Sequence, residues 1–244
     1  MKKLLLYSIL MSIVVLLPAC GDDDEPEGGS EQKEEQKEEQ KDNHEWVDLG
    51  LSSGTLWATT NVGASKPEEY GDYFAWGETK PKTANYDWST YKWCKGDEDQ
   101  LTKYCTNSSF GYNGFVDNKT ELDPEDDAAT ANWGPEWRMP STVQIDELCR
   151  ECDWQWTTRN GVNGYLVKSR RYNLSLFLPA AGLRWDDFFY EVGSYGNYWS
   201  RTLYGPLQNS VYIMYFYSDF VLFWNQRATR FLGLSVRPVR ASKN

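Results

Sequence analysis

Runs of β-branched and aromatic residues, separated by Gly, Pro, Asn and Asp, dominate the second half of the chain. Apolar runs bounded by turn-forming residues predict short β-strands. Near the start, residues 46–64 predict two further short strands around a Ser52-Ser53-Gly54 turn. The strands expected in the second half cover 164–170, 174–182, 196–202, 210–218, 220–225 and 234–240.

Two helices are expected between these groups of strands. Asp123 and Pro124 precede EDDAATANW, a pattern typical of an acidic N-cap with proline at the first helical position. Ser141 and Gln144 form a capping box, followed by a partly apolar face that stops at Asp153. Helices placed before most of the strands predict one α+β domain over residues 46–244, because no second linker interrupts it.

The first 19 residues predict a signal peptide. Two lysines precede a short apolar run, which ends in Leu17-Pro18-Ala19-Cys20. The run is too short to span a bilayer as a stable helix. A cysteine directly after small residues resembles the lipobox of bacterial lipoproteins, which implies lipidation of Cys20; the alternative is an ordinary secretory cleavage site.

Residues 20–45 predict a solvated tether. Residues 21–45 hold twelve acidic and three basic residues, which account for −9 of the chain's net charge of −11. A segment without apolar side chains cannot bury a core. Acidic residues after the lipidated cysteine resemble the export tag of Bacteroidota surface lipoproteins. We therefore expect lipid anchoring in the outer membrane with the domain on the cell surface; a periplasm-facing lipoprotein is the alternative.

The charge and the residue types exclude several functions. Without its tether and signal lysines the domain is still mildly acidic, so nucleic acid is not an expected partner. The single histidine, His44, lies in the predicted tether, which removes most metal and triad chemistry. Cys94 and Cys105 flank a polar loop and are disulfide candidates, and a zinc site with Cys149 and Cys152 is a weaker alternative.

Eight stretches together identify a family resemblance: WVDLGLSSGTLWATTNVGA, GDYFAWGE, DPEDDAATANWG, WRMPS, NGVNGY, LPAAG, GSYGNYWS and SVRPVR. They resemble the FISUMP, or major paralogous, domain family and follow one another over most of residues 46–240. That family is similar to the formylglycine-generating-enzyme branch of the C-type lectin fold. The resemblance implies a single α+β domain with two helices and a small twisted, mostly antiparallel sheet.

The same resemblance argues against two activities. Formylglycine-generating enzymes use cysteines in their C-terminal half, and this chain has none after Cys152. Calcium-dependent lectins use Glu-Pro-Asn and Trp-Asn-Asp motifs, whereas this chain has Trp224-Asn225-Gln226. We therefore expect no enzyme and no cofactor. A calcium site among Glu125, Asp126 and Asp127 remains an alternative to simple helix capping.

The region 201–232 is unusually rich in bulky apolar residues and arginines, and we predict that it forms a ligand-binding face. Strand alternation is expected to bury Val211, Ile213 and Tyr215 and to expose part of the remainder. The opposite assignment of faces would bury the residues of the predicted site. The predicted contacts are Arg201, Leu203, Tyr204, Phe216, Ser218, Phe220, Leu222, Phe223, Asn225, Arg227, Thr229, Phe231 and Leu232.

Most of these residues can be encoded by codons that end in a pyrimidine, which is the set that results from randomising the first two bases of an Asn codon. This resembles the variable proteins of diversity-generating retroelements, which carry a diversified face on the C-type lectin fold. The expected partner is a protein or a glycan at the cell surface. The alternatives are an apolar strand pair, or an undiversified glycan-binding or envelope structural lipoprotein.

Overall fold

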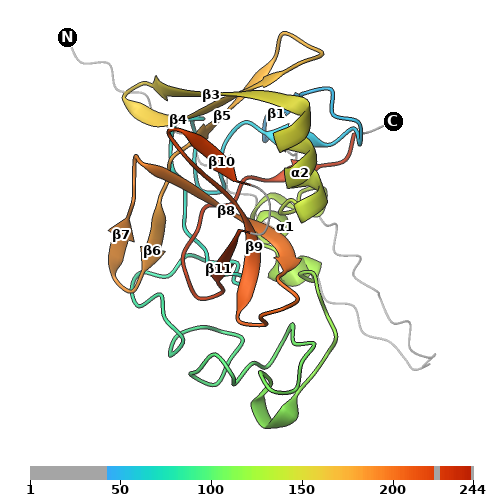
Figure 1. Cartoon of the computed structure of the whole chain (residues 1–244), viewed down its shortest axis with the longest axis vertical. Coiled ribbons are helices and arrows are strands. Elements are labelled where there is room, and N and C mark those ends of the chain that lie inside the picture. The colour runs from blue at the N-terminus through green and yellow to red at the C-terminus, as the bar shows by residue number, and fades with distance from the viewer. Residues whose placement is uncertain (1–42, 223–225, 243–244) are drawn as a thin grey trace, which may run out of the picture. The chain divides into compact units, whose positions relative to one another are not determined.

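Short antiparallel strands make up most of the regular structure of the chain (Figure 1). The structure is a computed structural model that describes residues 43–222 and 226–242. The predicted signal peptide, Cys20 and nearly all of the predicted tether lie outside these residues. None of the helices in the described part is long and apolar enough to cross a membrane.

The strands form several small sheets where the sequence predicted one. All pairings between the named strands are antiparallel, which confirms the α+β class with two helices. One sheet has the order β1 (Trp46–Asp48), β2 (Leu56–Ala58) and β12 (Val239–Arg240), and a second joins β3 (Cys152–Arg159), β4 (Val162–Ser169) and β5 (Ser175–Pro179). A third, two-stranded sheet is a hairpin of β6 (Leu183–Trp185) and β7 (Phe188–Tyr190).

The fourth sheet contains β8 (Tyr195–Leu203), β9 (Ser210–Tyr217), β10 (Phe220–Leu222) and β11 (Arg227–Thr229). Strand β9 pairs with the other three. Val211 and Ile213 on one face of β9 join one hydrophobic cluster, and Met214 and Phe216 on the other face join a second cluster. The prediction that only one face is buried was therefore wrong, because β9 is covered on both sides.

The helices illustrate which capping signals act locally. Helix α2 (Thr142–Glu151) has the predicted capping box, in which Gln144 N donates to Ser141 Oγ and Ser141 N donates to Gln144 Oε1. The first helix differs from the prediction. Residues 124–126 form one 3₁₀ turn, η2 (Pro124–Asp126), and helix α1 (Ala128–Trp133) starts later with Asp127 as its N-cap. Asp127 is the N-cap because its carboxylate accepts hydrogen bonds from Ala129 N and Thr130 N, whereas the side chain of Asp123 makes no capping hydrogen bond.

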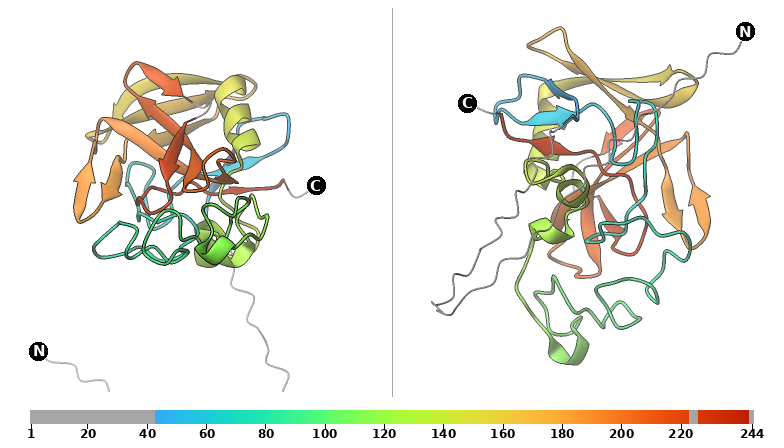
Figure 2. Two further views of the ribbon diagram at one scale, coloured as in Figure 1. Left: turned by 60° about the horizontal axis from the view of Figure 1, so that its bottom comes forward. Right: turned by 180° about the vertical axis from the view of Figure 1, so that it is seen from behind.

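The closing segment is not one continuous strand. Only Val239–Arg240 pairs with β2, while Leu234 and Ser235 form isolated bridges to Phe74 and Tyr198. The long loops between residues 79 and 121, teal to green in Figure 2, contain one short 3₁₀ helix, η1 (Tyr112–Gly114). They pack around a third cluster of buried tyrosines and Leu101.

The folded unit begins slightly before the predicted boundary at residue 46. The ring of His44 stacks on Trp133 with 3.8 Å between centroids. The carbonyl oxygen of Glu45 accepts a hydrogen bond from Thr59 N at 3.0 Å. His44 therefore belongs to the domain and not to the tether, and it contacts an aromatic ring.

Candidate functional site

A row of four aromatic side chains lies at one end of the β8–β9–β10 sheet. Tyr217 is central: its ring centroid is 5.5 Å from that of Tyr195, 6.1 Å from that of Tyr215 and 6.0 Å from that of Phe220. The side chain of Phe220 is exposed, and the three tyrosines are half-buried. We call Tyr195, Tyr215, Tyr217 and Phe220 the aromatic row.

The strand register explains why the row is open to solvent. Tyr195 pairs directly with Tyr217, and Tyr217 pairs with Phe220, so these side chains point to the same face of the sheet. Further along that face, Trp199 and Ile213 are covered by a hydrophobic cluster, whereas the end at Tyr217 is not. The Tyr165 hydroxyl donates to the carbonyl of Tyr217 at 3.1 Å and also approaches that of Ser218, which holds the β9–β10 turn.

Glu191 lies beside the aromatic row. Partial burial raises the pKa of its carboxyl above the usual value. Burial, together with the nearby Glu191 and Tyr195, raises the pKa of Tyr215 to about 12. The row therefore presents tyrosine hydroxyls next to the carboxyl group of Glu191, and both kinds of group can form hydrogen bonds with polar ligands.

The structure separates the predicted ligand-binding residues instead of assembling them into one face. Ser218, Phe220 and Arg227 are exposed, and Arg201, Thr229, Phe231 and Leu232 are half-buried. Phe223 and Asn225 lie outside the described residues, and for Leu222 only the backbone is described. Of the predicted contacts, Leu203, Tyr204 and Phe216 are buried.

The three buried residues correct the prediction for a clear physical reason. Phe216 has no exposed surface, because it packs against Tyr165 and Tyr198 in the cluster below α2. Leu203 sits in the cluster on the opposite face of the sheet. Tyr204 packs edge-on against Tyr212, and the Arg227 guanidinium covers its ring at 5.0 Å. As placed, none of the three can be the main contact of a surface ligand.

Two other predicted contacts serve packing as much as exposure. Phe231 packs edge-to-face against Trp88 of the long loops, with 5.1 Å between centroids. Leu232 packs against the cluster around Trp199 and Val211. They connect the end of the chain to the rest of the domain. Because their partners are distant in the sequence, no local pattern predicts these contacts.

Arg201 borders a cavity of about 440 Å³. Its guanidinium bonds to the carbonyl of Met139 and to Gln144 Oε1, each at 3.2 Å, and forms an ion pair with Glu121 at 3.1 Å. The cavity is also lined by Arg138 and by Arg240, which forms an ion pair with Glu136. Arg201 is thus already bonded on several sides.

Two arginines near the end of the chain are fully buried. Arg230 donates to the carbonyls of Lys103 and Tyr104, and its guanidinium carbon lies 5.2 Å from the centre of the Trp76 ring. Arg237 donates to Asn61 Oδ1 and to three backbone carbonyls. The arginines that gave the sequence its binding-site appearance therefore include Arg230, which joins the closing segment to the loops.

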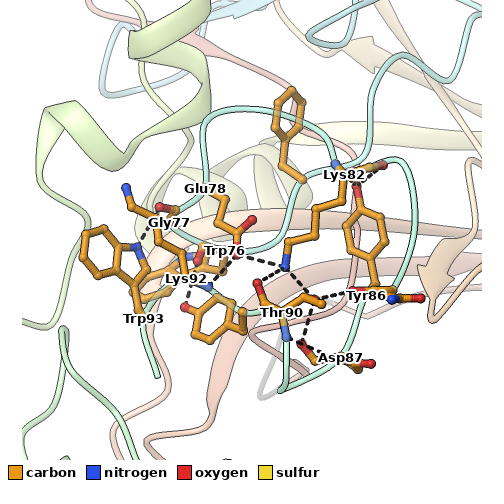
Figure 3. Close-up of polar contacts among 12 residues, drawn as sticks. Trp76, Gly77, Glu78, Lys82, Tyr86, Asp87, Thr90, Lys92 and Trp93 are labelled. Carbon is orange, nitrogen blue, oxygen red and sulfur yellow. Dashed lines mark hydrogen bonds and ion pairs between the residues drawn. The ribbon is translucent and has the colours of Figure 1, made fainter. Parts of the chain in front are cut away.

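A network of polar contacts orders the loop around Glu78 (Figure 3). Lys82 Nζ forms an ion pair with Glu78 at 3.0 Å and donates to the carbonyl of Thr90 at 2.9 Å. Glu78 accepts a bond from the backbone nitrogen of Lys92 at 2.9 Å, and the Trp93 indole donates to the carbonyl of Gly77. These groups satisfy one another, so the network is explained by loop stability.

The predicted calcium carboxylates are bonded to other groups. Asp126 accepts from the Tyr104 hydroxyl at 2.7 Å and from Lys103 Nζ at 2.5 Å. Asp127 accepts from backbone nitrogens, including that of Met139. In residues 43–222 and 226–242 no group of three or more His, Cys, Asp or Glu side chains could hold a metal ion.

The cysteine prediction needs a correction. Cys94, Cys105, Cys149 and Cys152 are all free thiols, so the predicted Cys94–Cys105 disulfide is absent from the structure. The Cys94 thiol donates to the carbonyl of Trp88, and the Cys105 thiol to that of Asn107, both at 3.1 Å. Burial raises the pKa of each of the two thiols. Each thiol is directed to a carbonyl within its own segment.

The β6–β7 hairpin is a feature that the sequence analysis missed. Trp185, Phe188, Phe189 and Tyr190 are exposed on it. Asp186 and Asp187 form the turn between its two strands, with Asp186 at a φ of 54°. The overlooked signal was the pair of short aromatic segments that flank these two acids.

Comparisons with known proteins supply no relative: no protein-family model, no curated protein and no solved structure matches the chain. The resemblance to the FISUMP family therefore rests on its motifs alone. Several of these motifs supply core residues, among them Trp57, Trp76, Trp137, Trp199 and Arg237.

Proposed function

We propose that the chain is a lipid-anchored protein of the outer-membrane surface that binds a protein or glycan ligand through the aromatic row, on a C-type-lectin-like domain. The observation that carries the proposal is the open end of the β8–β9–β10 sheet. Elsewhere both faces of β9 are covered, but Tyr217 and Phe220 lie where the cover stops. Clustered aromatic side chains at a solvent-accessible surface are typical of binding sites.

The predicted signal peptide, Cys20 and the acidic tether support the location. A chain of about 25 solvated residues holds a domain tens of ångströms from its anchor if it behaves as an open coil. The row would then be accessible to ligands outside the cell.

Diversification by a retroelement fits only part of the predicted face. Ser218, Phe220 and Arg227 are exposed and can change without disturbing the core. Randomising Leu203 or Phe216 would place polar residues in a hydrophobic cluster in many variants, at a cost of several kcal/mol. We therefore restrict the hypothesis to exposed positions. Sequencing the flanking DNA tests it, because a near-copy with Asn-type codons beside a reverse transcriptase is required.

The binding test uses variants of the full chain in detergent, on printed arrays of glycans and of envelope and host proteins. The first pair of substitutions changes the aromatic row, and the second changes Trp88 or Trp93 in the long loops. Tyr217→Ser with Phe220→Ser is expected to weaken any specific signal about 10- to 100-fold, the loss typical of aromatic hot spots. Tyr112→Ala, at an exposed aromatic on the long loops, serves as a control and should have no effect. Binding that survives the first pair but is lost on changing Trp88 or Trp93 would contradict the proposal and favour a loop-based glycan site.

A further inference from the structure

The β6–β7 hairpin lies at the edge of the domain (Figures 1 and 2). It presents an aromatic surface of its own. Trp185 pairs with Phe188, and Leu183 with Tyr190, so these side chains share one face of the hairpin. The exposed fractions of Trp185, Phe188 and Tyr190 are 54%, 63% and 42%. The rings of Trp185 and Tyr190 lie 6.0 Å apart, tilted by 42°.

The hairpin is held firmly from its other face. The Arg184 guanidinium donates to the carbonyls of Lys82 and Thr83, and it lies 4.8 Å from the Phe189 ring. At the tip, the backbone of Asp186 exchanges two hydrogen bonds with Tyr86. The aromatic face is thus exposed on a fixed support, so little conformational entropy is lost when a ligand binds.

Charge limits the type of ligand that fits. Asp186, Asp187 and Glu191 directly adjoin the aromatic residues in the sequence, and residues 185–200 include no lysine or arginine. Arg184, the one base within the two strands, is bonded on the opposite face. An anionic ligand such as a nucleic acid, an acidic polysaccharide or an anionic lipid surface would meet carboxylates with no compensating cation.

The area of the exposed aromatic face limits the size of the ligand. Aromatic side chains have surfaces of roughly 150–250 Å² each, so the exposed parts of the three rings amount to roughly 300–400 Å². A stable dimer needs about 800 Å² from each partner. The patch is therefore too small to support self-association, but it is large enough for two or three sugar rings.

We propose that the Trp185–Phe188–Tyr190 face of the β6–β7 hairpin binds a neutral glycan chain. The C–H face of a pyranose ring is apolar and carries a slight positive potential, which matches the negative face of an aromatic ring. The carboxylates of Asp186 and Glu191 can accept hydrogen bonds from sugar hydroxyls. A neutral sugar offers both an apolar C–H face and hydroxyl groups, and it carries no net charge. This site shares the neighbouring Glu191 with the aromatic row but none of the four rings of the row.

The test is affinity electrophoresis of the full chain in detergent through gels that contain mixed-linkage β-glucan, xyloglucan, galactomannan, α-mannan or dextran. At least one of these neutral polysaccharides is expected to retard the protein. Trp185→Ala and Phe188→Ala should each weaken that retardation at least tenfold. These side chains are exposed, so both variants should fold, as far-ultraviolet circular dichroism can verify.

Two controls keep this proposal distinct from the function of the aromatic row. Tyr112→Ala removes a ring that is 41% exposed, nearly the same as that of Tyr190, and should leave the retardation unchanged. Tyr217→Ser with Phe220→Ser should also leave it unchanged, whatever it does to other ligands. Retardation that falls with this pair and survives the hairpin variants overturns the assignment to the hairpin.

Ionic strength separates a neutral from a charged ligand. Binding to a neutral glycan should change less than twofold between about 50 and 500 mM NaCl, because no counter-charges are screened. Retardation by chitosan or polygalacturonate alone, or by none of the neutral polysaccharides, overturns the proposal. Loss of neutral-glycan binding at high salt does so as well.

Discussion

Replacing Arg237 by methionine is expected to destabilise the chain by about 3–5 kcal/mol, because buried acceptors that lose their donor cost about 1–3 kcal/mol each, and the relief from burying the guanidinium offsets part of this. Arg237 has no exposed surface. Its Nε donates to Asn61 Oδ1 at 2.7 Å, and Nη1 donates to the carbonyls of Ala58 and Phe177 at 3.2 and 3.1 Å and to that of Thr59. Methionine fills much of the same volume but donates none of these bonds.

The magnitude follows from two opposing contributions. Hydrogen bonds from a charged donor are worth about 1.5–3 kcal/mol each, and the three N–H groups of Nε and Nη1 make them to four acceptors, with one bond shared. The buried Nη2 has no hydrogen-bond partner among the described residues, which adds to the cost of burial. Against them stands the cost of burying the guanidinium, which is also visible in its pKa: burial lowers the pKa of Arg237 to about 10. The group nevertheless stays charged at neutral pH. The difference leaves a net stabilisation of a few kcal/mol.

The assay is urea unfolding of the full chain in a non-denaturing detergent, followed by tryptophan fluorescence and by circular dichroism. Arg227→Met is the matched control, because Arg227 is exposed and its loss should stay within about 0.5 kcal/mol apart from its contact with Tyr204. An Asn61→Leu variant and the double variant complete a cycle, which should show positive coupling. If Arg237→Met loses less than about 1 kcal/mol, desolvation cancels the bonds and the reasoning is refuted.

Three further predictions concern other parts of the structure. Ellman titration of the full chain in denaturant without reductant should find four thiols, because the four cysteines other than Cys20 are free; two thiols would restore the disulfide prediction. Phe216→Ser should cost about 3–5 kcal/mol in urea unfolding and Phe220→Ser less than about 1 kcal/mol, because one ring is buried and the other exposed; equal losses would contradict the assignment of faces. Hydrogen bonds from lysines lower the pKa of Asp123, so its contribution to stability is present above the unfolded-state pKa of about 3.9 and is lost as the pH falls through the lower folded value. The urea midpoints of wild type and Asp123→Asn should therefore converge as the pH falls below the unfolded-state pKa, and a constant difference down to pH 2 would contradict this.

Local signals were the ones that the sequence revealed correctly. The capping box at Ser141 and Gln144 involves atoms three residues apart, and the Ser52-Ser53-Gly54 turn is closed by a hydrogen bond from Gly54 N to the carbonyl of Leu51. The predicted start of α1 was wrong by four residues, because both Asp123 and Asp127 are possible N-caps. Asp127 is held in place by a hydrogen bond from Met139 N, which lies in the segment after the helix.

The ligand-binding face could not be predicted because exposure in this fold is decided by distant segments. Phe216 and Phe220 look alike in the sequence, but Phe216 meets the β3–β5 sheet and Phe220 meets solvent. Similarly, Arg230 bonds to carbonyls more than 120 residues away. The β6–β7 hairpin was not predicted, because each of its strands is only three residues long, which is too short to show a periodic pattern.

The position of β9 between two hydrophobic clusters has a consequence for how the domain comes apart. Neither cluster can lose its packing without removing one wall of the other, so the two should melt in a single cooperative transition. The third cluster, around Tyr86 and Leu101 in the long loops, contains no residue of β9. The loop segments around Tyr86 and Leu101 can therefore open locally while the sheets stay intact, and their amides should exchange with solvent well before those of β9. Tyr104, a loop residue that belongs to one of the β9 clusters, should stay protected with the sheet.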